Sequence, residues 1–97
     1  MRHQGATVAE LARVAELGVL PGETLTRLAE RMERQELAPG ERLETTHARC
    51  GVVVSGMLSG PGGLLRPGDT FEGSVTAATP ATVVSCPRAD YDELVRR

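Results

Sequence analysis

The chain has 97 residues, of which 13 are acidic and 11 basic, and its formal net charge is −2. A chain of this length forms one domain, and its charge gives no electrostatic basis for binding nucleic acid or an anionic membrane. Large side chains are scarce, with one Phe, one Tyr and no Trp, so Leu, Val and Ala are expected to fill a core of modest stability. All 11 basic residues are Arg, which is typical of a GC-rich bacterial genome.

The ends of the chain and its cysteines carry few signals. Residues 1–6 are interpreted as a flexible leader and residues 7–97 as the folded domain. No stretch is long and apolar enough for a signal peptide or a membrane span, so we expect a soluble, cytoplasmic protein. Cys50 and Cys86 are too few for a disulfide framework or a zinc site. We expect buried free thiols, which could form a redox pair only if their two strands face each other closely.

A first helix is predicted near the N-terminus. Thr7-Val8-Ala9-Glu10 has the form of a capping box, in which Thr and Glu side chains satisfy free amides at a helix start. The apolar spacing that follows predicts a helix over 8–17, and Gly18 is a natural C-cap.

A second helix follows the turn at Pro21-Gly22. Two ion pairs at i,i+4 spacing support it, Glu23 with Arg27 and Glu30 with Arg34. An apolar stripe at helical spacing is expected to pack on the rest of the domain, and it consists of Leu25, Leu28, Ala29 and Met32.

Two similar corners organise the remainder of the chain. In 38–41 and in 66–69, proline, glycine and an acidic residue stand in order between apolar positions. Proline presets the first corner of a β-turn, and glycine supplies the positive φ of a type II turn. Two such corners between short apolar runs predict a mainly β domain, a small antiparallel jelly roll or β-roll with two N-terminal helices and one C-terminal helix.

The predicted roll has about eight short strands. Ser55-Gly56 is interpreted as a two-residue hairpin turn and Gly60–Gly63 as a flexible loop. The strands are expected at 35–38, 42–45, 52–54, 57–59, 64–65, 70–72, 74–77 and 81–85. Pro87 begins the last helix, with Tyr91, Leu94 and Val95 inward and with Arg96 and Arg97 at the negative end of its dipole. We expect one core that joins Val52, Val54, Leu65, Phe71 and Val83.

The order of these elements resembles the cyclic nucleotide-binding domain family, which is the sensor part of CRP-like regulators and of nucleotide-gated channels and kinases. The likeness runs from Val19 onward and rests on five segments in the family's order. Leu20–Ala29 looks like the family's opening helix, Pro39–Glu41 like its first corner, Val54–Leu58 like its central hairpin, Leu65–Phe71 like its approach to the ligand, and Pro87–Leu94 like its closing helix.

The resemblance implies a phosphate-binding cassette directly after Phe71, made of a Gly-Glu pair, a short helix and an Arg. This chain has Glu72-Gly73 in the reverse order, Ser74 leads straight into the next strand, and no Arg lies between Arg66 and Arg88. A cyclic phosphate is an anion that needs fixed N–H donors and a paired charge. We therefore expect weak or absent binding of cyclic AMP and cyclic GMP. If the domain is a sensor, the candidate ligand-binding residues are Arg66, Phe71, Glu72 and Gly73.

Two parts that the resemblance implies for the family's regulators have no counterpart before Arg97. One is a long helix that covers the ligand and dimerises, and the other is a DNA-binding helix-turn-helix. We therefore do not expect a transcription factor that acts alone.

Catalytic interpretations find little support in the residues. Metal-dependent barrels need clustered His and carboxylate ligands, whereas His3 and His47 have no partner at ligand spacing. The pair His47 and Cys50 has no recognisable third group for nucleophilic catalysis. Gly60–Gly63 lacks the Lys of a phosphate-binding loop. We expect no enzyme, no metal and no cofactor.

Two hypotheses of function remain. The first is a non-enzymatic regulatory or scaffold module that docks on a partner protein or self-associates, because a roll without a lid helix leaves apolar surface that needs a cover. Arg27, Arg31 and Arg34 are candidates for the polar rim of such an interface. The alternative is a sensor that binds a cyclic nucleotide or another small molecule in the barrel. A ligand-sized pocket beside Phe71–Gly73 would favour the sensor.

Overall fold

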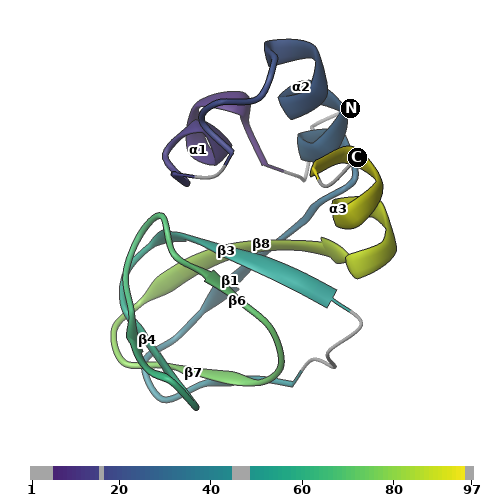
Figure 1. Cartoon of the computed structure of the whole chain (residues 1–97). Helices are drawn as coiled ribbons and strands as arrows, with labels where there is room; N and C mark the ends of the chain where they lie inside the picture. Colours follow the sequence, from purple (N-terminus) through teal and green to yellow (C-terminus); the bar gives the residue numbers. More distant parts are fainter. Residues whose placement is uncertain (1–5, 16, 45–48, 96–97) are drawn as a thin grey trace, which may run out of the picture.

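The computed structural model describes residues 6–15, 17–44 and 49–95 (Figure 1). The helices are α1 (Val8–Ala12), α2 (Gly22–Glu30) and α3 (Arg88–Val95). The strands are β1 (Glu33–Leu37), β2 (Arg42–Leu43), β3 (Arg49–Ser55), β4 (Leu58–Gly60), β5 (Gly63–Leu65), β6 (Thr70–Phe71), β7 (Val75–Ala77) and β8 (Ala81–Pro87). Within these ranges no helix is both long and apolar enough to cross a bilayer.

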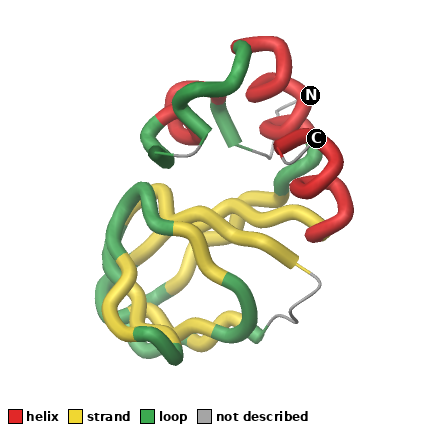
Figure 2. Tube along the Cα trace, viewed as in Figure 1, coloured by secondary structure: helices red, strands yellow, loops and turns green. Residues whose placement is uncertain are grey.

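The strands form two four-stranded sheets, and every pairing is antiparallel. One sheet has the order β1-β8-β3-β6 and the other β2-β7-β4-β5. The three helices lie together at one end of the molecule, on the side of the first sheet (Figures 1 and 2). The predicted fold class, a small antiparallel roll with two helices before it and one after it, is confirmed.

The two Pro-Gly corners carry the chain from one sheet to the other, at 38–41 and at 66–69. In each corner the amide of the acidic residue donates to the carbonyl oxygen of the residue before proline, at 2.9 Å in both. The carboxylate accepts a hydrogen bond in return from that residue's amide, at 2.9 Å in the first corner and 2.8 Å in the second. The glycines have φ of 84° and 96°, as a type II turn requires.

The predicted hairpin at Ser55-Gly56 is wrong, because β3 and β4 belong to different sheets. Gly56 has φ of 81°, and a Cβ there would lie 2.2 Å from the carbonyl oxygen of Pro80, so only glycine fits this crossing. The hairpin instead joins β4 to β5, with Gly60 opposite Gly63. The segment predicted as a flexible loop is thus a tight turn at Pro61-Gly62.

The capping box at the start of α1 is confirmed. The amide of Glu10 donates to Thr7 Oγ1 at 3.2 Å, and the amide of Thr7 donates to Glu10 Oε1 at 2.9 Å. Burial raises the pKa of Glu10, but hydrogen bonds from Arg34 and Thr7 outweigh it and bring that pKa below its ordinary value. Arg34 lies in β1, 2.6 Å from Glu10, so the helical pairing predicted for it with Glu30 is wrong.

The first helix is shorter than predicted, because it ends at Ala12 rather than at residue 17. The chain continues as turns in which the amide of Val14 donates to the carbonyl of Leu11 and the amide of Leu17 to that of Val14. Hydrogen bonds from an amide to the carbonyl three residues earlier are those of a 3₁₀-helix, which has three residues per turn. This spacing buries Leu11, Val14 and Leu17 together.

The single predicted core is wrong, since two hydrophobic clusters lie on opposite faces of the β1-β8-β3-β6 sheet. Side chains alternate along a strand, so Val52 faces the helices and Val53 faces the interior of the roll. The helix-side cluster is Ala6, Leu11, Val14, Leu17, Leu25, Leu28, Ala29, Met32, Cys50, Val52, Val84, Cys86 and Tyr91. The roll-interior cluster is Leu37, Leu43, Val53, Leu58, Phe71, Val75, Ala77, Ala81 and Val83.

The predicted packing of the helices is confirmed at most positions. The apolar stripe of α2 is buried in the helix-side cluster, as is Tyr91 of α3. Leu94 and Val95 are partly buried against the same cluster. Ala6, the last residue of the predicted leader, is buried there too, whereas residues 1–5 and the predicted dipole contacts at 96–97 lie outside the described residues.

Candidate ligand pocket

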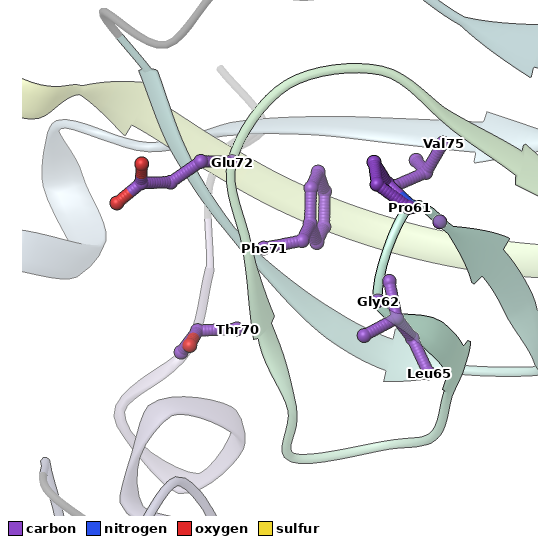
Figure 3. A pocket seen from close by; sticks show the side chains of 8 residues that line it. Pro61, Gly62, Leu65, Thr70, Phe71, Glu72 and Val75 are labelled. Atoms are coloured by element: carbon purple, nitrogen blue, oxygen red, sulfur yellow. The ribbon is translucent and has the colours of Figure 1, made fainter.

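A pocket of about 370 Å³ opens into the roll between the β4–β5 hairpin and the segment from β6 to β7 (Figure 3). Its lining residues are Gly60, Pro61, Gly62, Leu65, Thr70, Phe71, Glu72 and Val75. The β4–β5 hairpin thus supplies one side and the strand ending at Phe71 the other. A pocket beside Phe71 is the feature that distinguishes a sensor from a packed scaffold.

Phe71 is held as a wall of this pocket by the strand opposite it. Its register partner on β3 is Gly51, where a Cβ would lie 2.3 Å from the ring atom Cζ. The ring therefore rests directly on the backbone of Gly51. Figure 3 shows the ring directed toward Pro61 and Val75, whereas the side chains of Thr70 and Glu72 point away from them. The side chains that face one another across the pocket are consequently apolar.

Glu72 is the one charged residue among the described residues that line the pocket. Its carboxylate accepts a hydrogen bond from Arg88 at the start of α3, and Arg88 also lies 3.7 Å from Asp92. The hydrogen bond and the charge of Glu72 raise the pKa of Arg88 above its ordinary value. Glu72 therefore serves an internal ion pair that connects the pocket rim to α3.

The link between β6 and β7 is three residues long and contains no helix. Gly73, at its centre, is buried and has φ of 81°, and the hydroxyl of Ser74 donates to Glu44 Oε1 at 3.3 Å. The expected loss of the short helix after Phe71 is thus confirmed. No helix N-terminus and no Arg stand among the described residues that line the pocket.

The structure brings together two of the four candidate ligand-binding residues, Phe71 and Glu72. Gly73 follows them in the buried link, and Arg66 is exposed in the second Pro-Gly corner, outside the lining. The sequence interpretation missed the hairpin glycines and Arg88. Gly60 and Gly62 were missed because a turn at Pro61-Gly62 was interpreted as a loop. Nothing local connects Arg88 with Glu72, which lies in another element.

The described residues contain no group of three or more His, Cys, Asp or Glu side chains arranged to hold a metal ion. His3 and His47 lie outside the described residues, so the predicted absence of a site on them stays a prediction. Cys50 lies in β3 and is buried, as predicted, as is Cys86.

The three arginines proposed for an interface rim all pair with carboxylates of this chain. Arg27 lies 3.9 Å from Glu23 within α2. Arg31 at the end of α2 lies 3.1 Å from Asp90 and 3.3 Å from Glu93, both on α3. Arg34 pairs with Glu10, as described above. Two of the three therefore connect elements of the domain to one another.

No protein-family model and no curated protein sequence matches the chain. Several solved structures match it. The regulatory subunit of a cAMP-independent protein kinase A from Trypanosoma cruzi, bound to guanosine, superposes with a TM-score of 0.74 at 18% identity over 92% of this chain. A cyclic nucleotide-binding-like protein from Brucella abortus superposes with a TM-score of 0.67 at 18% identity over 93% of this chain. The N-terminal domain of a Streptomyces coelicolor transcriptional regulator superposes with a TM-score of 0.69 at 19% identity over 93% of this chain.

The share of each matched protein that this chain covers differs. The chain spans 40% of the trypanosome subunit, 78% of the Streptomyces domain and 97% of the Brucella protein. Each of the three matches covers more than nine tenths of this chain. The chain has the fold of the cyclic nucleotide-binding domains, in a shortened form without a helix between β6 and β7.

Proposed function

We propose that this chain is a non-enzymatic regulatory domain that senses a small, uncharged and planar molecule in the pocket of its β-roll. The observation that carries the proposal is a pocket of about 370 Å³ whose facing side chains are apolar and whose one acidic residue is paired with Arg88. Small-molecule sites are mostly apolar clefts of roughly 300–1,000 Å³ with a few polar groups. This pocket lies within that range.

Phe71 gives the pocket a preference for flat ligands. Aromatic rings stack on planar heterocycles, and such a contact contributes about 1–3 kcal/mol for a nucleic acid base. The glycines of the hairpin, Gly60 and Gly62, allow a ligand to approach the backbone, whose N–H and C=O groups give directional hydrogen bonds. A purine-sized heterocycle fits these requirements.

The described lining of this pocket, in contrast, lacks the groups that bind a cyclic phosphate. Removing an anion from water costs several kcal/mol unless donors replace its hydration. The described lining offers neither Arg nor a helix N-terminus, and it contains Glu72. Without an Arg–phosphate pair, a loss of about 2–5 kcal/mol takes a micromolar site toward the millimolar range.

The molecule bound to one structural neighbour supports the same inference. The trypanosome regulatory subunit belongs to a cAMP-independent kinase and is bound to guanosine, a nucleoside without a phosphate. One protein that contains this fold therefore binds an uncharged nucleoside. We extend this to the present chain as a proposal, with purine nucleosides as the first compounds to test.

Docking on a partner protein or self-association stays a prediction with less support than the pocket. In the described part of the chain, the exposed large hydrophobic residues are Val8, Val19 and Leu64. They belong to α1, to the connection before α2 and to β5, so they come from three separate segments. Sedimentation that gives a stable monomer, together with no partner recovered from the native cell, would contradict this prediction.

Isothermal titration with guanosine, adenosine, cyclic GMP and cyclic AMP tests the proposed function. We expect saturable binding of a nucleoside, and binding of its cyclic monophosphate that is weaker by tenfold or more. Low-micromolar binding of either cyclic nucleotide would overturn the proposal, as would the failure of both nucleosides to bind.

A pair of matched variants locates the binding. A Cβ added at Gly62 or at Gly22 meets no atom within 4 Å, and only Gly62 lines the pocket. Gly62→Leu should abolish nucleoside binding while the thermal midpoint stays close to that of the wild type. Gly22→Leu should leave binding intact. Equal affinity in the wild type and Gly62→Leu would place the ligand elsewhere.

A further inference from the structure

The two cysteines lie directly opposite each other on neighbouring strands. Cys50 of β3 and Cys86 of β8 are register partners in an antiparallel pair, and both side chains are buried. Opposite residues in such a pair project to the same face, with Cα atoms about 4.5–5.5 Å apart. A disulfide needs Cα atoms about 4.4–6.8 Å apart. The Cα spacing expected for this pair therefore falls within the range of a disulfide.

The surroundings give the two thiols different roles. Cys86 is fully buried and Cys50 retains 8% of its exposure. Burial, followed by the charges of Cys50 and Asp90, raises the pKa of Cys86 to about 11, against the opposing effect of Arg49 and Arg31. Cys86 is thus a protonated, shielded thiol at neutral pH, and Cys50 is the first of the two that a reagent can reach.

We propose that Cys50 and Cys86 form a reversible cross-strand disulfide when the protein meets a hydroperoxide. The Cys50 thiol gives up its proton as its sulfur attacks a peroxide oxygen, the O–O bond breaks, and Cys50 becomes a sulfenic acid while the leaving hydroxide takes up that proton as water. The Cys86 sulfur then displaces the sulfenic oxygen and loses its proton, so that an S–S bond forms and water is released. Two thiols and one hydrogen peroxide give one disulfide and two waters, and an added dithiol reverses the change by exchange.

Helix α3 is placed to control this reaction. Its Tyr91 belongs to the helix-side cluster together with both cysteines. The helix is fastened to the end of α2 by Arg31, which lies 3.1 Å from Asp90 and 3.3 Å from Glu93. Access of the reagent to the pair should therefore depend on the opening of α3, and a weaker fastening should speed the oxidation.

The test treats the whole chain with hydrogen peroxide at neutral pH, removes the peroxide with catalase, and then unfolds the protein in N-ethylmaleimide. Intact mass spectrometry should show a monomer that has lost two hydrogen atoms and takes up no label. Incubation with dithiothreitol before labelling should restore two labels. Two labels on the peroxide-treated native protein, or loss of label only in a covalent dimer, would overturn the proposal.

Single variants separate the steps. Cys86→Ala should stop at a sulfenic acid that dimedone traps, whereas Cys50→Ala should react several-fold more slowly than the wild type. Arg31→Ala should form the disulfide several-fold faster, and Arg27→Ala, which breaks an exposed pair within α2, should keep the wild-type rate. An unchanged rate in Arg31→Ala would refute the control by α3. An intramolecular disulfide that forms only in the denatured chain would refute the site itself.

Discussion

At the scale of single residues, the contact between Phe71 and Gly51 decides the shape of the pocket. The ring occupies the space where any other residue at position 51 would place its Cβ, 2.3 Å from Cζ. It belongs to the roll-interior cluster and also lines the pocket. One side chain is thus both part of the core and part of the proposed ligand surface.

Replacing Phe71 by Ala should lower the free energy of unfolding by about 3–5 kcal/mol, which is the usual cost of removing a buried aromatic ring. For a domain of modest stability this is close to complete unfolding. Urea denaturation followed by circular dichroism measures this loss.

Gly51→Ala should destabilise the domain by about 1–3 kcal/mol, because the ring of Phe71 must move. Gly51→Ala should lower the free energy of unfolding less in a protein that already carries Phe71→Leu than it does in the wild type. Additive costs would show that the two residues do not touch.

The raised pKa of Cys86 predicts a dependence of stability on pH. The ordinary value of 9.0 applies to the unfolded chain, whereas burial, with Cys50 and Asp90, raises the folded value to about 11 against Arg49 and Arg31. Between these values the unfolded state loses a proton that the folded state keeps, so the free energy of unfolding falls as the pH rises. The loss should approach roughly 2–3 kcal/mol across that window.

Urea denaturation in the presence of a reductant, at intervals from pH 9 to pH 11, measures this loss. Cys86→Ala is the control, because it removes the titrating thiol and keeps Tyr91 and the arginines. Its stability should decline less than that of the wild type over the same range. Identical slopes would contradict a protonated, buried Cys86.

At the scale of elements, the sequence predicted what short segments determine by themselves. The capping box of α1 and both Pro-Gly corners form as expected, because each is closed by hydrogen bonds between residues three apart. The hairpin at Ser55-Gly56 failed for the opposite reason. Whether a glycine begins a hairpin or a crossing depends on which sheet the next strand joins, and the contact with Pro80 that fixes this comes from a distant segment.

The same distinction holds for the pocket. Phe71 and Glu72 were proposed because they follow a corner that resembles the family's approach to its ligand, and the missing helix was predicted because too few residues stand where that family has its cassette. The hairpin wall at Gly60–Gly62 and the partner of Glu72 could not be predicted, because both depend on pairings between different elements. The core was misassigned because Val52 and Val53 face opposite sides of a sheet that is covered on both.

The ion pair between Glu72 and Arg88 connects two elements, so its loss should loosen the start of α3. Arg88→Ala should increase amide hydrogen exchange in α3 while leaving the exchange of β3 and β8 unchanged. The global free energy of unfolding should change little, as is usual for exposed pairs. Arg27→Ala is a matched control within one helix. Unchanged exchange in α3 would show that the helix is held by its apolar face alone.

At the scale of the whole molecule, one sheet organises both halves of the domain. The helices cover the outer face of β1-β8-β3-β6, and the roll interior lies against its inner face. The pocket is lined by residues from β4 to β7 on the interior side, whereas the cysteine pair lies on β3 and β8 on the helical side, so the proposed ligand and the proposed oxidation act on opposite sides of this sheet.

The place of β8 in that sheet has a consequence for synthesis of the protein. It is the last strand along the chain, yet it lies between β1 and β3 and pairs with both. Until residues 81–87 leave the ribosome, β1 has no neighbour in its sheet and β3 has only β6. Such non-local pairing folds slowly, on a scale of about milliseconds to seconds. Nascent chains that stop before β8 therefore display unpaired strand edges, which is when this domain has most need of a chaperone.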